Sequence, residues 1–251
     1  MTNYGVGLLT TFLLGIFILI GAIIPLFLVK KDKVINLSIG LAFGVIVTLI
    51  VTDLLPEILE ELGLKYIYLF LIFTAVGFFL LRLLDGYIPD HHDHKMTKKE
   101  ANENLTHIGI MTTLALILHN IIEGMAVYST ALADASLALS LALGVGFHNI
   151  PLGMVISSSF YHSSKNLKKT IISLLLVSIS TFCGGLIMYL FKITSVNSVL
   201  LGVLLSLTLG MLLFIVIDEL LPRIKNTKDK KTVFIGVVIG VILLLIGVLL
   251  G

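Results

Sequence analysis

Two polar hexapeptides stand inside apolar stretches of this chain: HNIIEG begins at His119, and HNIPLG begins at His148. They share His, Asn and Gly at matching positions, and they differ where Glu123 of the first is matched by Leu152 of the second. Imidazole nitrogens, carboxylates and amide oxygens are ligands of first-row divalent cations such as zinc and iron. The residue types therefore predict a cation site, provided that the fold brings the two hexapeptides together.

The chain that must position these residues is too apolar for a water-soluble domain. Its 251 residues are 57% hydrophobic and only 13% charged, and its mean hydropathy is +1.10, so its apolar surface exceeds what one soluble core could bury. Eight apolar stretches are each long enough to cross a hydrocarbon layer of about 30 Å as a helix. They cover approximately residues 5–29, 34–55, 66–84, 107–131, 137–161, 170–191, 198–221 and 233–250. We therefore expect an all-α membrane protein, with eight transmembrane helices in a single domain over residues 1–251.

The basic residues are predicted to lie on one side of the membrane. If the N-terminus is outside, all 17 Lys and Arg residues except Lys65 and Lys192 fall on the inner side, which is the side that positive charges favour. Both termini are then expected outside. The first apolar stretch has no basic residue before it and is interpreted as a retained helix rather than a signal peptide. Because topology accounts for the basic residues, nothing in the sequence favours nucleic-acid binding.

Both hexapeptides are predicted to lie near the middle of the bilayer. His119 is about 12 residues, or about 18 Å, into the fourth helix, and His148 is about 11 residues into the antiparallel fifth helix. His119 and Glu123 share one helical face, with Asn120 beside Glu123. An ionised Glu at this depth costs on the order of 3 kcal/mol unless it has partners. Each residue alone could be an interhelical hydrogen bonder, but their convergence favours a functional site of His119, Asn120, Glu123, His148 and Asn149.

A second internal similarity indicates an inverted repeat. VTDLLPEI, residues 51–58, ends the second helix on the outer side, and IDELLPRI, residues 217–224, ends the seventh helix on the inner side. Helices one to three and six to eight would then form inverted triplets around the fourth and fifth helices, a 3+2+3 arrangement of a kind common in transporters. The acids of these segments either mark helix ends or belong to an ion pathway, and their repetition favours a pathway. They are Asp53 on the outer side and Asp218 with Glu219 on the inner side.

The longest polar connection, residues 89–104, reads PDHHDHKMTKKEANEN and is expected on the inner side. It is either a solvated linker or a segment that holds metal ions loosely, because histidine-rich runs bind metals without a fixed geometry. The histidines concerned are His91, His92 and His94.

HNIIEG and HNIPLG resemble the paired HNxPEG motifs in the fourth and fifth helices of the ZIP (Zrt- and Irt-like) divalent-metal transporters. The eight helices, the histidine-bearing loop and the acid-plus-LP endings agree with this family, and the chain is most similar to its short bacterial branch. The resemblance implies uptake of zinc, iron, manganese or cadmium across a bacterial cytoplasmic membrane, without enzymatic activity or a prosthetic group. It also implies that the central helix pair, with neighbouring helices, moves against a scaffold of the triplets in an alternating-access cycle. It leaves a homodimer open.

Two positions depart from the family pattern. Leu152 stands where the second motif of the family has a Glu that helps to bridge two metal ions, and an alignment of the sixth helix places Gly184 and Gly185 where this branch often has Glu and Pro. Two cations about 4 Å apart need such carboxylates in order to coexist. We therefore predict a mononuclear site with altered affinity or ion preference. Its principal ligands would be His119, Glu123 and His148.

Two other functions fit part of the sequence. A membrane metal-binding protein, serving as a sensor or reserve, would tolerate the loss of a carboxylate that transport requires. An intramembrane metalloenzyme has less support, because the chain contains no HExxH motif and no activated nucleophile beside the histidines. Metal flux across a vesicle membrane would separate a transporter from a protein that only binds metal.

Overall fold

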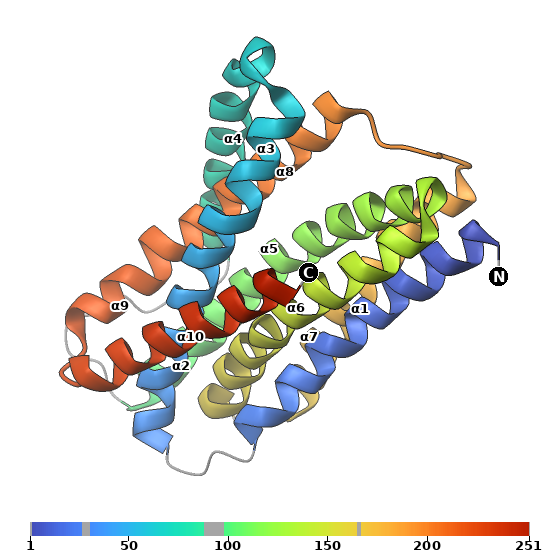
Figure 1. The fold of residues 1–251 in the computed structure, drawn as a ribbon. Coiled ribbons are helices and arrows are strands. Elements are labelled where there is room, and N and C mark those ends of the chain that lie inside the picture. The colour runs from blue at the N-terminus through green and yellow to red at the C-terminus, as the bar shows by residue number, and fades with distance from the viewer. Residues whose placement is uncertain (1, 27–30, 88–97, 165–166, 251) are drawn as a thin grey trace.

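The computed structural model describes residues 2–26, 31–87, 98–164 and 167–250, and these are helical apart from short connections (Figure 1). The long helices are α1 (Asn3–Leu26), α2 (Lys31–Leu49), α4 (Ile67–Asp85), α5 (Lys98–Ala133), α6 (Ala135–Ser164), α7 (Leu167–Leu190), α8 (Ser198–Phe214) and α10 (Lys230–Leu250). Two short helices, α3 (Leu55–Leu62) and α9 (Leu221–Asn226), extend α2 and α8.

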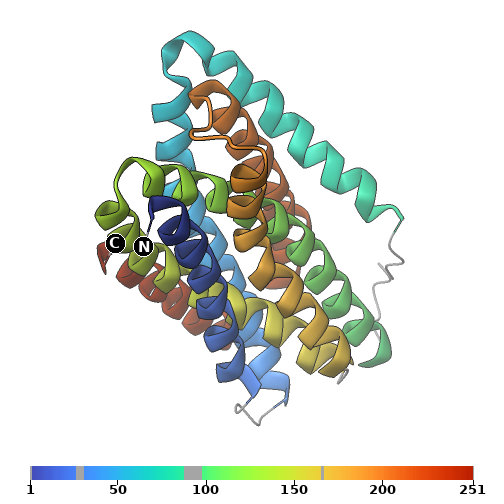
Figure 2. The ribbon, with the colours of Figure 1, turned by 90° about the vertical axis from the view of Figure 1, so that its right-hand side faces the viewer.

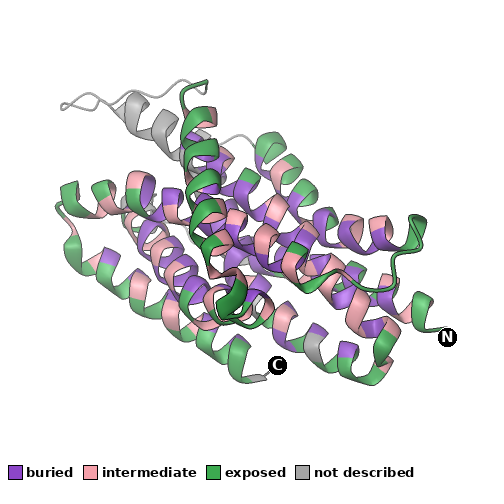
Figure 3. Ribbon diagram, turned by 90° about the horizontal axis from the view of Figure 1, so that it is seen from above, coloured by how far each residue is buried: buried purple, intermediate pink, exposed green. Residues whose placement is uncertain are grey.

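Eight helical segments of the described chain are long and apolar enough to cross a membrane. Their buried faces meet inside the bundle, while the outer faces are exposed (Figure 3). On α4, which is the least buried span, Leu71, Phe79 and Leu83 are all exposed. Such an apolar surface is favourable in contact with lipid, whereas its exposure to water would be unfavourable. The all-helical class and the eight candidate spans are therefore confirmed.

The second and seventh spans each contain a π-helical turn. Ile50–Leu54 separates α2 from α3, and Ile215–Leu220 separates α8 from α9. A Leu-Pro pair follows each turn, so the proline falls in the first turn of the next helix, where its missing N–H breaks no intrahelical hydrogen bond. Both spans consequently run past their predicted ends, to Leu62 and Asn226. Single π-helical turns inside helices are frequent at functional sites.

Helix α5 begins well before the apolar stretch that predicted it. It starts at Lys98, so the connection expected at 89–104 is shorter than predicted. Lys, Glu and Ala residues in this segment favour a helix but add no hydropathy, and hydropathy alone therefore could not place the helix start. The loop histidines His91, His92 and His94 lie outside the described residues.

The contacts between helices divide them into two groups, whose members can be located in two views at right angles (Figures 1 and 2). Helices α1, α5, α6 and α7 all contact one another, and we call them the first unit. The remaining helices form two pairs, α2 with α10 and α4 with α8, which are linked mainly where α3 contacts α8. We call these helices, with α9, the second unit. The two units meet mainly where α6 contacts α2 and α10 and where α5 contacts α8.

Close backbone approaches at glycine hold each unit together. A Cβ atom at Gly153 of α6 would overlap the carbonyl oxygen of Ile18 in α1, and one at Gly184 of α7 would overlap that of Ile121 in α5. Similar approaches join α2 to α10 and α4 to α8. The interhelical glycine approaches described for this chain all lie within one unit or the other. Since glycine is what lets two backbones come so close, the tightest packing is inside the units.

Candidate metal centre

Helices α5 and α6 bring the two hexapeptides together inside the first unit. A single residue, Asp134, connects the two helices (Figure 1). Its carboxylate accepts hydrogen bonds from the backbone N–H groups of Ser136 and Leu137, which caps the start of α6. Such a short connection makes the two helices antiparallel neighbours, so residues at equal depth lie side by side.

Glu123 lies between polar side chains of both helices. Its Oε1 is 3.7 Å from Nε2 of His119 on the same helix, and its Oε2 accepts a 3.4 Å hydrogen bond from Nδ2 of Asn149 on α6. His119 and Asn149 are buried, and only 9% of the Glu123 side chain is exposed. The structure thus places the carboxylate between an imidazole and an amide and withdraws it from solvent.

Asn120 and Asn149 each keep a buried amide oxygen. Nδ2 of Asn120 donates a 3.2 Å hydrogen bond to the carbonyl oxygen of Val177 in α7. Oδ1 of Asn120 and Oδ1 of Asn149 have no hydrogen-bond partner among the described residues, which is rare for buried polar atoms. His148 lies on α6, but its side chain is outside the part of the chain that the structure describes. Of the five predicted ligands, the contacts described join His119, Glu123 and Asn149.

The two departures from the family pattern have different structural settings. Leu152 is fully buried and belongs to the main apolar cluster. Gly184 faces the backbone of α5 so closely that no side chain fits there, and a carboxylate therefore has no room at this position. One turn earlier, Thr181 is also buried, and its Oγ1 has no hydrogen-bond partner in the described chain.

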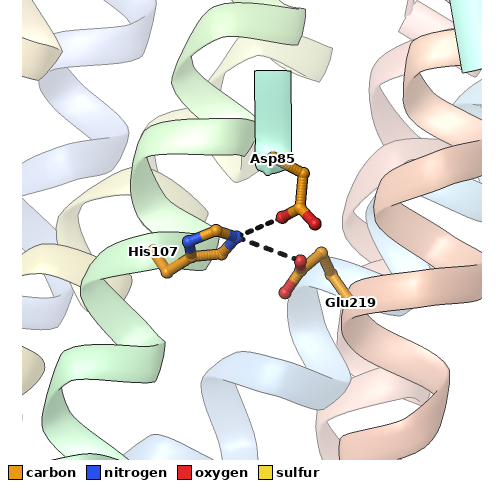
Figure 4. A group of neighbouring side chains, drawn as sticks. All are labelled: Asp85, His107 and Glu219. Carbon is orange, nitrogen blue, oxygen red and sulfur yellow. Dashed lines mark hydrogen bonds and ion pairs between the residues drawn. The ribbon is translucent and has the colours of Figure 1, made fainter. Parts of the chain in front are cut away.

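A second group of polar side chains lies where α4 ends, between α5 and the π-helical turn that follows α8 (Figure 4). Nε2 of His107 is 2.6 Å from Oδ1 of Asp85 and 3.3 Å from Oε1 of Glu219. The three residues offer donor atoms that lie within 4.8 Å of one another. His107 and Glu219 are buried and Asp85 is partly exposed. One imidazole and two carboxylates form a donor set that a zinc or iron ion could use.

Two arginines neutralise part of the negative charge around this group. Nη1 of Arg82 is 3.5 Å from Oδ2 of Asp218, and Nη2 of Arg223 is 3.7 Å from Oε2 of Glu219. The Arg223 pair is the more buried of the two, so solvent screens it less. Of the two inner acids predicted from the sequence, Glu219 belongs to the Asp85–His107–Glu219 group, whereas Asp218 is paired with Arg82.

Sequence reasoning missed Asp85 and His107. The expected third span ends at residue 84 and the expected fourth begins at 107, so topology alone would place both residues on the same side as Glu219. That signal fixes depth only. Whether the ends of α4, α5 and α8 meet laterally is decided by the tertiary packing.

Comparison with known proteins identifies the family of this chain. A family model described as ZIP Zinc transporter matches residues 88–247. Zinc transporter ZupT of Clostridium perfringens is 28% identical over an alignment that covers the whole chain and 97% of that protein. Proteins of the same name from Chlorobium chlorochromatii and Enterobacter sp. strain 638 are 27% and 26% identical, over 88% and 94% of this chain and 87% and 93% of their own lengths. The chain therefore belongs to the ZIP zinc transporter family, a family of multi-pass membrane transporters and not of enzymes.

Proposed function

We propose that this protein transports zinc through a site between α5 and α6, and that iron, manganese or cadmium can take the place of zinc. The observation that carries this proposal is the buried contact of Glu123 with His119 and Asn149, next to two amide oxygens without hydrogen-bond donors. A divalent cation would satisfy these oxygens and balance the carboxylate. Membership of a zinc transporter family supports the same conclusion.

The proposed ligand set keeps all five predicted residues. His119 and Glu123 would supply a nitrogen and a carboxylate from α5, and Asn149 would supply an amide oxygen from α6. His148 is the second imidazole in this set, and Asn120 is held nearby by its hydrogen bond to α7. All five belong to the first unit, so an ion bound there would travel with that unit.

Acidic side chains in the second span support a route from one end of the bundle to this centre. Asp53 stands in the π-helical turn, and Glu57 follows it by one helical turn on α3. Glu57 interacts electrostatically with both Asp53 and Glu123. The three acidic side chains would offer oxygen ligands to a cation in succession, which supports the predicted pathway role of Asp53. We place Asp218 and Glu219 at the opposite mouth, near which the loop histidines His91, His92 and His94 would capture ions.

An inverted repeat is supported by matching glycine contacts inside the first unit. Helix α1 crosses α6 with the same pattern by which α7 crosses α5. In each crossing, a glycine of the hexapeptide meets a carbonyl of the partner helix, and the Ile three residues before it meets a partner glycine. The pairs are Gly153 with Ile18 and Ile150 with Gly21 in the first crossing, and Gly124 with Thr181 and Ile121 with Gly184 in the second.

The second unit repeats this behaviour with a different set of residues. Helix α2 crosses α10 as α8 crosses α4, again through two reciprocal contacts of a glycine with a carbonyl. The pairs are Gly44 with Val237 and Leu41 with Gly240 in the first crossing, and Gly210 with Thr74 and Leu207 with Gly77 in the second. A constant shift of 166 positions relates α2 to α8, in the glycine contacts and in the Leu-Leu-Pro segments that follow. These correspondences support two triplets related by inversion.

We infer that transport moves the first unit against the second. The predicted moving part was the pair of central helices with neighbouring helices, against a scaffold of the triplets. The packing favours a division in which α1 and α7, one helix from each triplet, stay with the central pair. Because the glycine approaches lie inside the units, the boundary between them is the place where sliding disturbs the fewest close contacts. Such a motion would expose the centre to each side in turn.

The distribution of charge supports one orientation of the protein in the membrane. An even number of spans places both termini on the same side of the membrane. The excess of Lys and Arg lies in the loops on the opposite side, which is therefore the cytoplasmic side, and the termini are outside. The Asp85–His107–Glu219 group then lies at the cytoplasmic end. We propose that ions move inward across a bacterial cytoplasmic membrane.

The direct test is zinc flux into proteoliposomes. In vesicles that contain the purified protein and a trapped fluorescent zinc indicator, the initial rate of fluorescence increase is expected to saturate with external zinc. Protein-free vesicles should show no increase in fluorescence. Binding of zinc by the purified protein without any flux would contradict the proposal. That result would favour a membrane sensor or reserve, which the apolar Leu152 in place of a carboxylate also fits.

The central site is expected to hold a single ion. Leu152 offers no ligand and Gly184 has no room for one, so a second ion would lack the bridging carboxylates. Equilibrium dialysis against zinc is best done in an His107→Ala background, which removes the second group. The difference in bound zinc between this variant and the His107→Ala/Glu123→Ala double variant is expected to be one ion per chain. A difference of two ions would overturn the mononuclear assignment.

A further inference from the structure

The Asp85–His107–Glu219 group differs from the central group in how it is built. His107 projects from α5 of the first unit, whereas Asp85 ends α4 and Glu219 lies in the π-helical turn after α8, both in the second unit (Figure 4). The predicted central ligands all come from α5 and α6. The cluster therefore crosses the boundary between the units, and the central group does not.

The geometry suits an ion that would tie the two units together. Nε2 of His107 already lies between one carboxylate oxygen of Asp85 and one of Glu219. Zinc binds imidazole nitrogen and carboxylate oxygen at about 2.0–2.2 Å, and donor atoms within 4.8 Å of one another can surround an ion with small side-chain movements. The side chains of His107 and Glu219 are 1% and 5% exposed, so little solvent competes for the ligands. Arg223 contacts the other carboxylate oxygen of Glu219, which leaves Oε1 directed at His107.

We propose that a first-row divalent cation bound by Asp85, His107 and Glu219 clamps the two units in the arrangement seen here. A ligand shifts a conformational equilibrium by the difference in its affinity for the two states. If the units slide, His107 leaves the two carboxylates and the three-residue site is lost, so the ion binds this arrangement best. Metal that accumulates on the cytoplasmic side would thereby slow its own uptake. This inference rests on the proposed motion and orientation, but the binding itself does not.

The clamp can be tested without transport by measuring the distance between the units. Spin labels at Ile171→Cys on α7 and Ile235→Cys on α10 report on the first and second units, and both positions are exposed. The background carries Cys183→Ser, to remove the native thiol, and Glu123→Ala, to remove the central site. Zinc chloride is expected to narrow the distance distribution to one population. An unchanged distribution at saturating zinc would overturn the proposal.

Matched variants assign the effect to this cluster. Asp85→Asn keeps the size and hydrogen-bonding capacity of the side chain and is expected to raise the zinc concentration for half-maximal narrowing by about tenfold or more. His107→Ala should abolish the narrowing. Asp229→Asn changes a partly buried acid that lies just before α10, outside the cluster, and keeps an oxygen that can accept the hydrogen bond from Thr232, so it should leave the midpoint unchanged. Equal responses of all three variants would show that the zinc acts elsewhere.

Vesicles loaded with zinc test the consequence for transport. The measured quantity is the ratio of initial uptake rates with and without internal zinc. We expect this ratio to be well below one for the unmodified protein and close to one for Asp85→Asn. Narrowing of the distances without any uptake would reject the transport function and keep the clamp. Uptake with no narrowing and no effect of internal zinc would reject the clamp and keep the transporter.

Discussion

Replacing Glu123 with alanine is expected to lower zinc uptake by about a hundredfold or more. Glu123 is the carboxylate that joins His119 of α5 to Asn149 of α6, and it offsets the positive charge of the bound ion in a buried place. Losing even an outer partner of a metal ligand typically costs 10–100-fold in affinity, and losing a charged ligand at this depth should cost more. The measurement is the initial rate of zinc uptake into proteoliposomes.

Two matched variants make this result interpretable. Glu123→Gln removes the charge but keeps an oxygen that can accept the hydrogen bond from Asn149, so it should fold normally and still lose most of the uptake. Glu60→Ala removes an exposed acid of α3 and should leave uptake close to that of the unmodified protein. Wild-type uptake by the Glu123→Gln protein would show that the charge of Glu123 is not needed and would remove the central site from the proposal.

Alanine at Gly184 is expected to destabilise the protein by about 1–3 kcal/mol, which is the usual cost of adding volume to a closely packed interior. The new methyl group would overlap the carbonyl oxygen of Ile121, so α5 and α7 would have to separate. Because Ile121 belongs to the first hexapeptide, the shift should also displace Asn120 and its hydrogen bond to Val177. The measurement is the amount of folded protein that remains after heating to a series of temperatures, determined by size-exclusion chromatography in detergent.

The control for this variant is alanine at Gly86, which ends α4. There a new Cβ atom would lie 3.5 Å from the carbonyl oxygen of Leu83, an ordinary contact, and the backbone φ is −61°. The change in stability should stay within about 0.5 kcal/mol, as for most surface substitutions. Equal melting temperatures for Gly184→Ala and the unmodified protein would mean that α5 and α7 are less tightly packed than the structure indicates.

Hydropathy was sufficient to find the eight spans, because a helix that crosses a bilayer must be apolar over a fixed length. It failed where polar residues extend a helix beyond that length, as at Lys98, and where a proline follows a π-helical turn, as in the second and seventh spans. In both cases the helix continues without a hydropathy signal.

The contacts of Glu123 with His119 and Asn149 were predictable because helical periodicity and a short connection act together. The spacing of His119 and Glu123 fixes a helical face, and the short connection between α5 and α6 fixes equal depth for Asn149. The cluster at the end of the bundle was not predictable in the same way. Asp85, His107 and Glu219 are at similar depth in three different spans, and depth does not determine which helices are neighbours.

The sequence by itself determined that this is an eight-span helical membrane protein with a polar centre at two matching hexapeptides. It did so because burying polar groups in lipid is costly, and the few that remain are therefore conspicuous. Only the tertiary structure decided that α1 and α7 pack with the central pair, and that His107 meets acids of the other unit. The first of these packings depends on glycine approaches between helices that are distant in sequence, such as α5 with α7 and α1 with α6. A linear pattern of residues specifies neither these pairings nor the contact between the two units.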